Sequence, residues 1–477
     1  MAHAGNRGKL PAKTKLGYAV GQLTDSIGFN VFYVFFLFFL TDYAGIPPGL
    51  AGLVVLISVI WDALADPIVG QISDSLNSRW GRRRPLMLAG VVPYGLCMFL
   101  LFTNVDMEPT AKAVYFTCIA IVFWSCYKIF VIPHFALGAE ITSDFNERTA
   151  LRIWASFFLY FATILTSAFP LKIVDICVQA GATASRGWSV TGLVLGFCII
   201  GTGIYCWAAT KGGELELSPK ERSKGGGLRA LKELPANMLS LLRLSPSRYL
   251  AVTVFLWAVV FSMTSGGIVY LMSSNLHYST DEKSLCLLAF SLFGILWLPL
   301  VNRISSRFDK QVAITASMFI SGVACVAFYL VGFPGMGLFL VFLALVQLGN
   351  SAFWTLSYSM MYDISELDEF VNARRREGGI TALMSFVQKL GGALAVWGMG
   401  VILGMGGYDG MAGTQSDSAL QSVLLVNTVL PGIIGIAAAV AALLYPLNRK
   451  RFTALVEALK AKRENREYST AGFEKLL

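Results

Sequence analysis

The sequence predicts an all-α membrane protein with twelve transmembrane helices arranged as two six-helix halves. The first observation is the composition, in which 55% of the 477 residues are hydrophobic and only 14% are charged, whereas about a quarter of a soluble domain is charged. The second is a series of apolar runs of about 20 residues, each long enough to cross a bilayer as a helix. The third is a long polar segment that divides these runs into two sets of six.

Each expected helix is a continuous apolar run without the alternation of a membrane β-barrel strand. The first run follows basic and polar residues and is too long for the core of a signal peptide, so it is expected to remain as the first span. The twelve runs are 17–41, 50–75, 85–103, 112–139, 151–176, 187–209, 247–272, 284–302, 311–332, 336–363, 378–406 and 420–446.

The net charge of +9 follows membrane topology and does not indicate a nucleic-acid partner. If both termini are cytoplasmic, the inner segments hold 32 of the 38 Lys and Arg residues and the outer loops hold four. Two more, Lys128 and Lys389, lie within spans. Because basic residues concentrate on the cytoplasmic side of membrane proteins, the sequence predicts a multi-pass protein of the cell membrane with both termini cytoplasmic.

The two halves are expected over 1–209 and 247–446, joined by a cytoplasmic linker over 210–246 and followed by a tail over 447–477. "AEITSDFNERT" follows the fourth run, and "YDISELDEFVNARRRE" follows the tenth in the same way. Repeated halves are typical of secondary transporters, with the substrate between them near the membrane midplane. The tail is expected to form a helix near the inner membrane surface.

No enzyme motif is present. The sequence contains no GxxxxGK[ST], HExxH or GxSxG pattern, so neither an enzyme nor an ATP-driven pump is expected. The eight cysteines form no CxxC pair, and they predict no disulfide framework and no structural metal site. The expected partners are a small-molecule substrate and the lipid bilayer, without a cofactor.

Five charged side chains lie deep within the spans. An ionised side chain at the centre of a membrane helix costs about 2.5–3.5 kcal/mol on insertion scales, so such residues usually face the bundle interior and have a function. At 1.5 Å per residue, all five lie roughly 12–20 Å from the inner face, and we expect them to meet. They are Asp25, Asp62, Asp66, Lys128 and Lys389.

Asp62 and Asp66 are the most informative of these residues. Four residues turn a helix by about 400°, so the two carboxylates lie on one face, about 40° apart. Two adjacent carboxylates in a low dielectric require a proton, a metal ion or an ammonium group. We therefore predict a cation-coupling site at Asp62, Asp66 and Lys128. The alternative is structural: one aspartate caps a helix break at Pro67, or pairs permanently with Lys128.

Two further features have weaker interpretations. His134 could titrate near neutral pH, but a packed, hydrogen-bonded histidine is the favoured interpretation. The basic loop "RWGRRRP" keeps its side of the protein cytoplasmic and could pair with acidic groups as a conformational latch. The residues predicted for this latch are Asp74, Arg82, Arg83, Asp363 and Arg375.

Several of these segments together resemble a known family. The strings "IWDALADPIVGQISDSLNSRWGRRRP", "IPHFALGAEITSDFNERTALR" and "MSFVQKLGGALAVWGMGVILGMGGY" resemble the glycoside–pentoside–hexuronide cation symporters. This family is a branch of the major facilitator superfamily, typified by the melibiose carrier. The resemblance covers both halves, roughly residues 8–450, and implies the major facilitator fold.

The resemblance also assigns roles to residues. It implies that Asp62 and Asp66 bind the coupling cation, that Asp25 holds sugar hydroxyls, and that Trp354 and Lys389 complete the substrate cavity. Tyr127 stands where the family has a tyrosine near the site, and Phe135 stands in place of a tryptophan. The substrate-binding residues are therefore expected to be Asp25, Tyr127, Phe135, Trp354 and Lys389.

The sequence departs from the family pattern at four further positions. Lys128 replaces a hydroxyl-bearing residue that binds the cation, and Ala65 replaces an asparagine between the two aspartates. Val131 and Ser156 replace an aspartate and an arginine that bind galactosides. These changes favour protons over Na⁺ as the coupling cation, although Na⁺ at Asp62 and Asp66 remains an alternative.

The expected function is import of a glycoside, hexuronide or related small polar solute, including an anionic one, by cation symport with alternating access. One alternative is an uncoupled facilitator in which Lys128 is a fixed counter-ion. Another is a carrier of an amphiphile or lysolipid. A monomer is expected.

Overall fold

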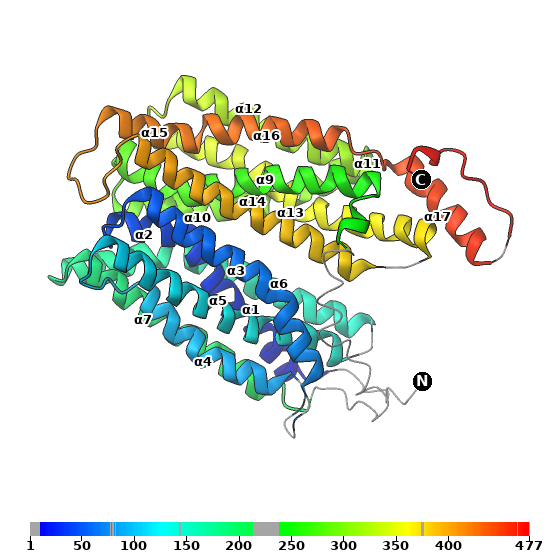
Figure 1. Cartoon of the computed structure of the whole chain (residues 1–477), viewed down its shortest axis with the longest axis horizontal. Helices are drawn as coiled ribbons and strands as arrows, with labels where there is room; N and C mark the ends of the chain where they lie inside the picture. Colours follow the sequence, from blue (N-terminus) through cyan, green and yellow to red (C-terminus); the bar gives the residue numbers. More distant parts are fainter. Residues whose placement is uncertain are drawn as a thin grey trace. The chain divides into compact units, whose positions relative to one another are not determined.

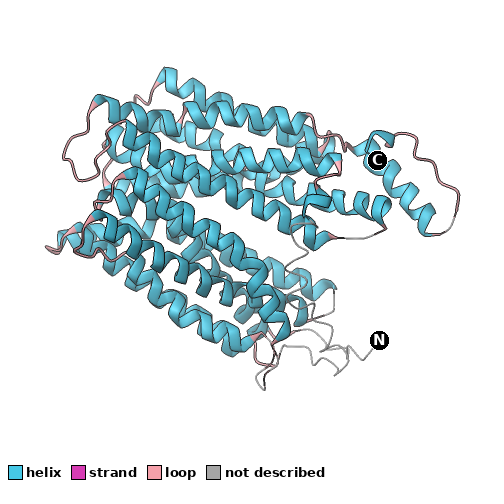
Figure 2. Cartoon of the chain, viewed as in Figure 1, coloured by secondary structure: helices cyan, strands magenta, loops and turns pink. Residues whose placement is uncertain are grey.

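The computed structural model describes residues 10–76, 78, 81, 83–142, 145–212, 238–373, 376–464 and 466–476. Within these ranges the chain forms helices joined by short loops and no strand (Figure 2). The α-helices, labelled in Figure 1, are α1 Ala12–Val31, α2 Leu37–Asp42, α3 Pro48–Ser75, α4 Arg84–Leu101, α5 Pro109–Glu140, α6 Phe145–Gln179, α7 Ala184–Ala209, α9 Ser245–Tyr270, α10 Thr280–Leu296, α11 Leu298–Arg307, α12 Lys310–Val331, α13 Met336–Asn372, α14 Glu377–Met405, α15 Asp417–Asn427, α16 Val429–Leu443 and α17 Arg449–Arg463. Three short helical segments of other types, which Figure 1 does not label, are η1 Phe32–Phe36, η3 Leu271–Asn275 and η4 Glu474–Leu476.

The prediction of an all-α protein with twelve spans is confirmed. Twelve helical segments of the described chain are long and apolar enough to cross a membrane. Their ends differ from the expected ones. The tenth continues to Asn372, nine residues beyond the apolar run. Its last turns are polar, so the apolar pattern ends before them, but they remain helical where they pack against the tail helix α17. The eighth span consists of α10 and α11, which separate at Trp297. Pro299, at the start of α11, lacks the N–H that would continue the hydrogen-bond ladder.

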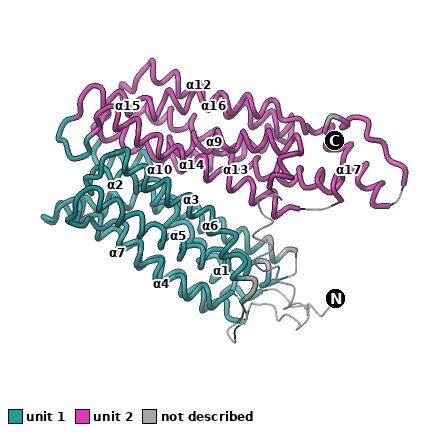
Figure 3. Tube along the Cα trace, in the orientation of Figure 1, with its two compact units in different colours: residues 1–231, 278–288, 409–414 teal, residues 232–277, 289–408, 415–477 magenta. Residues whose placement is uncertain are grey.

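The chain divides into two compact units, coloured separately in Figure 3. Most of the linker predicted over 210–246 lies outside the described residues, so its boundaries stay a prediction. Unit 1 contains Met1–Leu231, Tyr278–Leu288 and Asp409–Thr414, and unit 2 contains Lys232–His277, Ala289–Tyr408 and Gln415–Leu477.

The same packing pattern occurs within each unit. In unit 1, α1 lies against α6 and α7, and α4 lies against α5 and α7. In unit 2, α9 lies against α14 and α16, and α12 lies against α13 and α16. The first, third, fourth, fifth and sixth spans of one unit therefore have the same neighbours as their counterparts in the other, which is the internal repeat expected of this fold.

Glycines allow the equivalent helix crossings in both units. A Cβ atom added to Gly95 of α4 would lie 2.6 Å from the carbonyl oxygen of Gly196 in α7. In unit 2, a Cβ on Gly322 of α12 would lie 2.9 Å from the carbonyl oxygen of Gly432 in α16. Small residues let membrane helices approach until their backbones touch, and this close packing is a main source of their association.

The outer faces of the helices are apolar. Large side chains remain exposed in the middle of spans, including Phe197 at 66% and Phe319 at 50%. Hydrocarbon does not penalise such exposure, whereas it would be costly in water over so large an area. The exposed apolar surface therefore agrees with a membrane location.

The tail forms a helix, as the sequence predicts, and this helix packs into unit 2. Leu455 and Leu459 of α17, with Phe473 beyond it, are buried in the hydrophobic cluster of that unit. The ring of Phe473 lies 5.2 Å from that of Phe370 in α13. The tail therefore covers the last turns of α13.

Candidate functional site

Unit 1 contains a buried ion-pair cluster between α3 and α5. The Nζ atom of Lys128 lies 2.9 Å from Oδ1 of Asp62 and 2.8 Å from Oδ1 of Asp66. Lys128 and Asp62 are buried, whereas the Asp66 side chain is 35% exposed. The structure thus brings together the three residues that the sequence predicts for cation coupling.

Local structure explains this meeting. Asp62 and Asp66 are one turn apart on α3, which continues unbroken through Pro67, and both carboxylates pair with Lys128. This arrangement favours the ion pair over the capping of a break at Pro67. The indole Nε1 of Trp61, next to Asp62 on α3, donates a hydrogen bond of 2.8 Å to the hydroxyl of Ser125, one turn before Lys128 on α5. This bond fixes the two helices side by side.

A second buried carboxylate group lies on α1. Asp25 accepts a hydrogen bond at Oδ1 from the Tyr127 hydroxyl at 2.6 Å and another at Oδ2 from the side-chain amide of Gln22. Both donors are neutral. Gln22 was not predicted from the sequence, although its position three residues before Asp25 on one helix face could have indicated it.

The two groups are adjacent because Tyr127 and Lys128 are neighbours on α5. The Nζ atom of Lys128 lies 4.9 Å from the centroid of the Tyr127 ring. Together the groups contain three carboxylates and one ammonium group. Fully ionised, these four groups would carry a net charge of −2, and one of the carboxylates, Asp66, is partly exposed.

His134 is packed and hydrogen-bonded, the interpretation that the sequence favours. It is fully buried, its Nε2 atom lies 2.9 Å from the carbonyl oxygen of Tyr18, and the two rings stack with centroids 4.6 Å apart.

Of the remaining predicted substrate residues, Trp354 and Lys389 belong to unit 2 and Phe135 to unit 1. Trp354 of α13 packs in unit 2 with its ring 5.5 Å from that of Phe261, and Lys389 is a half-buried residue of α14. Phe135 of α5 is 42% exposed, and its ring centroid lies 5.7 Å from that of His134. Their roles in binding stay predictions.

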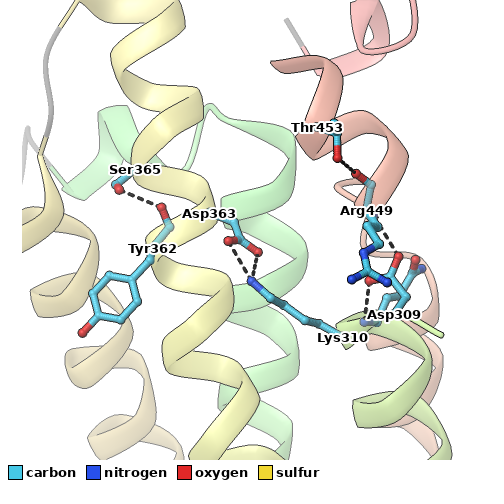
Figure 4. A network of polar contacts seen from close by, with 8 residues as sticks. Asp309, Lys310, Tyr362, Asp363, Ser365, Arg449 and Thr453 are labelled. Carbon is cyan, nitrogen blue, oxygen red and sulfur yellow. Dashed lines mark hydrogen bonds and ion pairs between the residues drawn. The ribbon is translucent and has the colours of Figure 1, made fainter. Parts of the chain in front are cut away.

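The latch residues that the structure describes have partners within their own units. Arg83 donates through Nε to Glu140 at 3.1 Å and through Nη1 to the hydroxyl of Ser73 at 2.6 Å. Asp363 accepts two hydrogen bonds from Lys310, at 2.6 and 2.8 Å (Figure 4). The predicted latch residues Arg82 and Arg375 and the Asp74 side chain lie outside the described residues, so the latch stays a prediction.

The Lys310–Asp363 pair belongs to a larger polar network in unit 2. Asp309, the neighbour of Lys310, accepts a hydrogen bond from the backbone N–H of Arg449 at 2.8 Å (Figure 4). Further along the tail, Arg463 forms a bidentate pair with Glu369 of α13 at 2.6 and 2.8 Å. This pair raises the pKa of Arg463. The network ties α12, α13 and the tail together.

The twelve candidate spans of the described residues, in two repeated units with charged residues buried inside, are typical of a secondary transporter. The family model described as "MFS/sugar transport protein" matches residues 17–449. The chain therefore belongs to this family, in agreement with the resemblance to the glycoside–pentoside–hexuronide symporters.

Individual relatives agree with this membership. An uncharacterized symporter of Synechocystis sp. is 26% identical over 96% of this chain and 98% of its own length. The glucuronide carrier protein homolog of Escherichia coli is 24% identical over 94% of this chain and 95% of its own. A crystal structure of a D-xylose–proton symporter has a TM-score of 0.63 at 14% identity, covering 91% and 98% of the two chains, and shows the fold alone.

Proposed function

We propose that the protein imports a glycoside, hexuronide or related small polar solute by proton symport, with alternating access between its two halves. The observation that carries the proposal is the position of Lys128 between Asp62 and Asp66. The ammonium group occupies the space between the carboxylates that a bound sodium ion would need. Protons are therefore favoured over sodium as the coupling ion.

In the proposed cycle, a proton binds to Asp66, the more exposed partner of Lys128. Its carboxylate then loses its charge, and Lys128 is held by Asp62 alone. This change in pairing between α3 and α5 alters the relative stability of the inward-open and outward-open states, which is the requirement for coupling.

We assign substrate binding to residues outside the Lys128 ion-pair cluster. Asp25, supported by Tyr127, accepts hydrogen bonds from substrate hydroxyls, as a fixed carboxylate acceptor can. Trp354 stacks on the apolar face of a sugar ring, and Lys389 pairs with a carboxylate of the substrate. A relative named as a glucuronide carrier homolog supports a hexuronide as the first substrate to test. We propose a monomer in the cell membrane.

The test is uptake of radiolabelled methyl β-D-glucuronide and of methyl β-D-galactoside into proteoliposomes. Accumulation driven by an inward proton gradient at constant sodium supports the proposal. Accumulation that requires a sodium gradient would assign the site to sodium. Equilibration without accumulation under either gradient would indicate an uncoupled facilitator, and transport of lysolipid alone would indicate an amphiphile carrier.

Variants at the cluster separate coupling from binding. Asp66→Asn is expected to abolish accumulation in a proton gradient while exchange of internal for external substrate continues. Asp106→Asn, at an exposed loop position, is the control and should accumulate substrate normally. Loss of exchange as well as accumulation in Asp66→Asn would place this residue in substrate binding.

A further inference from the structure

α1 and α5 meet at a second contact, closer to the N-terminus of α1 than the Asp25–Tyr127 contact. The proposed transport cycle does not use it. His134 and Tyr18 form it through the hydrogen bond to the Tyr18 carbonyl oxygen and through the stacked rings. A carbonyl oxygen only accepts, so Nε2 of His134 carries the proton and donates. The buried Nδ1 atom has no hydrogen-bond partner within the described residues, and a second proton there would be an unsatisfied charge. His134 therefore forms this contact as a neutral donor.

Two glycines make room for the contact. A Cβ atom on Gly21 of α1 would lie 2.5 Å from Nε2 of His134 and 2.7 Å from Sγ of Cys206, so a larger residue would force one of these side chains to move. A Cβ atom on Gly138 of α5 would collide with the Tyr18 hydroxyl. Each helix therefore inserts one ring into a space that a glycine leaves open on the other, and this reciprocal insertion fixes the two helices along their length.

The contact is in register with the Asp25–Tyr127 hydrogen bond. Tyr18 precedes Asp25 by seven residues on α1, and His134 follows Tyr127 by seven residues on α5. Seven residues are about two helical turns, roughly 10.5 Å. Both contacts therefore lie on the same faces of two antiparallel helices, at equal intervals, and a shift at one displaces the other.

A third contact lies beyond Asp25. The Tyr94 hydroxyl of α4 lies against Gly28 of α1, where a Cβ atom would collide with it. The Tyr94 ring is 5.6 Å from the ring of Tyr127. Asp25 is thus flanked on α1 by two positions, Gly21 and Gly28, at which a ring from a neighbouring helix contacts the backbone.

We propose that His134 is a positioning residue for the substrate site: its hydrogen bond to Tyr18 sets the register of α1 against α5 and so keeps Asp25 on the Tyr127 hydroxyl. The part of this inference that concerns substrate rests on the proposed function. The part that concerns register does not.

The first experiment measures register directly. Structures of the wild type and of His134→Phe in lipid nanodiscs, determined by cryo-electron microscopy with a bound antibody fragment, give the Tyr127–Asp25 distance. The Phe ring retains the stacking and loses the donor. We expect the distance to exceed 3.5 Å in His134→Phe and to remain near 2.6 Å in His134→Gln, which keeps a donor. A distance near 2.6 Å in His134→Phe would overturn the proposal.

A second variant, Gly21→Ala, tests the proposal if His134→Phe does not fold. Its added methyl group is expected to displace the His134 ring and so to lengthen the Tyr127–Asp25 distance. Its matched control is Gly201→Ala, a helical glycine of α7 with nothing within 4 Å of an added Cβ. An unchanged Tyr127–Asp25 distance in a Gly21→Ala structure that has lost the His134–Tyr18 hydrogen bond would also overturn the proposal.

The second experiment measures the consequence for binding with methyl β-D-glucuronide as the probe. We expect His134→Phe to raise KM about tenfold, with the pH dependence of accumulation unchanged and with partial rescue in His134→Gln. Because His134 acts through Tyr127, His134→Phe should add little to the effect of Tyr127→Phe in a double-mutant cycle. Additive effects, or an altered pH dependence, would contradict the positioning role. If the wild type transports no probe, the proposed function fails, and the structures still decide the register.

Discussion

Lys128 pairs with Asp62 at 2.9 Å, and both residues are buried inside the bundle. Breaking a buried ion pair by removing one partner typically costs about 3–5 kcal/mol, because the other charge remains buried. The neighbouring Asp25 is different, since its hydrogen bonds come from the neutral side chains of Tyr127 and Gln22. Substitutions at the two groups should therefore have different consequences.

Lys128→Met, which keeps the length of the side chain and removes its charge, should lower the unfolding temperature in detergent markedly at pH 8. Lys450→Met, at an exposed position of the tail helix, is the control. A thermal shift of Lys128→Met no larger than that of Lys450→Met would contradict the pairing.

Two of the close helix crossings within the units depend on direct contact between backbones. At the α4–α7 crossing, the carbonyl oxygen of each glycine lies where the Cβ of the other would be, and the α12–α16 crossing repeats this arrangement. Burial of α17 against α13 is a different kind of contact, since it depends on apolar side chains and on the Arg463–Glu369 pair.

Gly196→Ala should destabilise the protein by about 1–3 kcal/mol, the usual cost of forcing extra atoms into a packed interface. The measurement is the unfolding temperature in detergent. Gly201→Ala on the same helix has open space around it and should have no measurable effect. Equal unfolding temperatures for the two variants would mean that α4 and α7 do not cross at Gly196.

Leu455→Ala removes a fully buried side chain of α17 and should cost about 2–5 kcal/mol of local stability. We expect faster amide hydrogen exchange over Arg449–Arg463 and little change within the spans. Val456→Ala, whose side chain is 39% exposed, is the matched control. Rapid exchange of this segment in the wild type would contradict its packing into unit 2.

The whole molecule is predicted to place both termini in the cytoplasm. This orientation follows from the 38 Lys and Arg residues of the sequence, most of which lie on one side of the proposed topology. The fold itself is compatible with either orientation, because its helices and loops do not record which side is the cytoplasm.

Alkaline phosphatase and green fluorescent protein fused to the C-terminus test this orientation in bacterial cells. A C-terminus in the cytoplasm should give fluorescence and no phosphatase activity. A phosphatase fusion in the loop around Asp106 is the control and should be active. The opposite result at the C-terminus would overturn the assigned topology.

The sequence by itself determined the class of the protein and most of its buried charges. Apolar runs long enough to cross a bilayer determine the number of spans because hydrocarbon leaves a backbone few alternatives to helices. The cost of burying charge identified Asp25, Asp62, Asp66 and Lys128 as residues of the bundle interior. Only the tertiary structure decided which groups pair. It placed Lys128 on two carboxylates and gave Asp25 two neutral donors, one of them Gln22. It also identified the partner of the packed, hydrogen-bonded His134 that the sequence favoured, the carbonyl oxygen of Tyr18. The physical reason is that these pairings depend on the rotation and register of neighbouring helices, which are fixed by side-chain packing and glycine contacts between residues far apart in the chain.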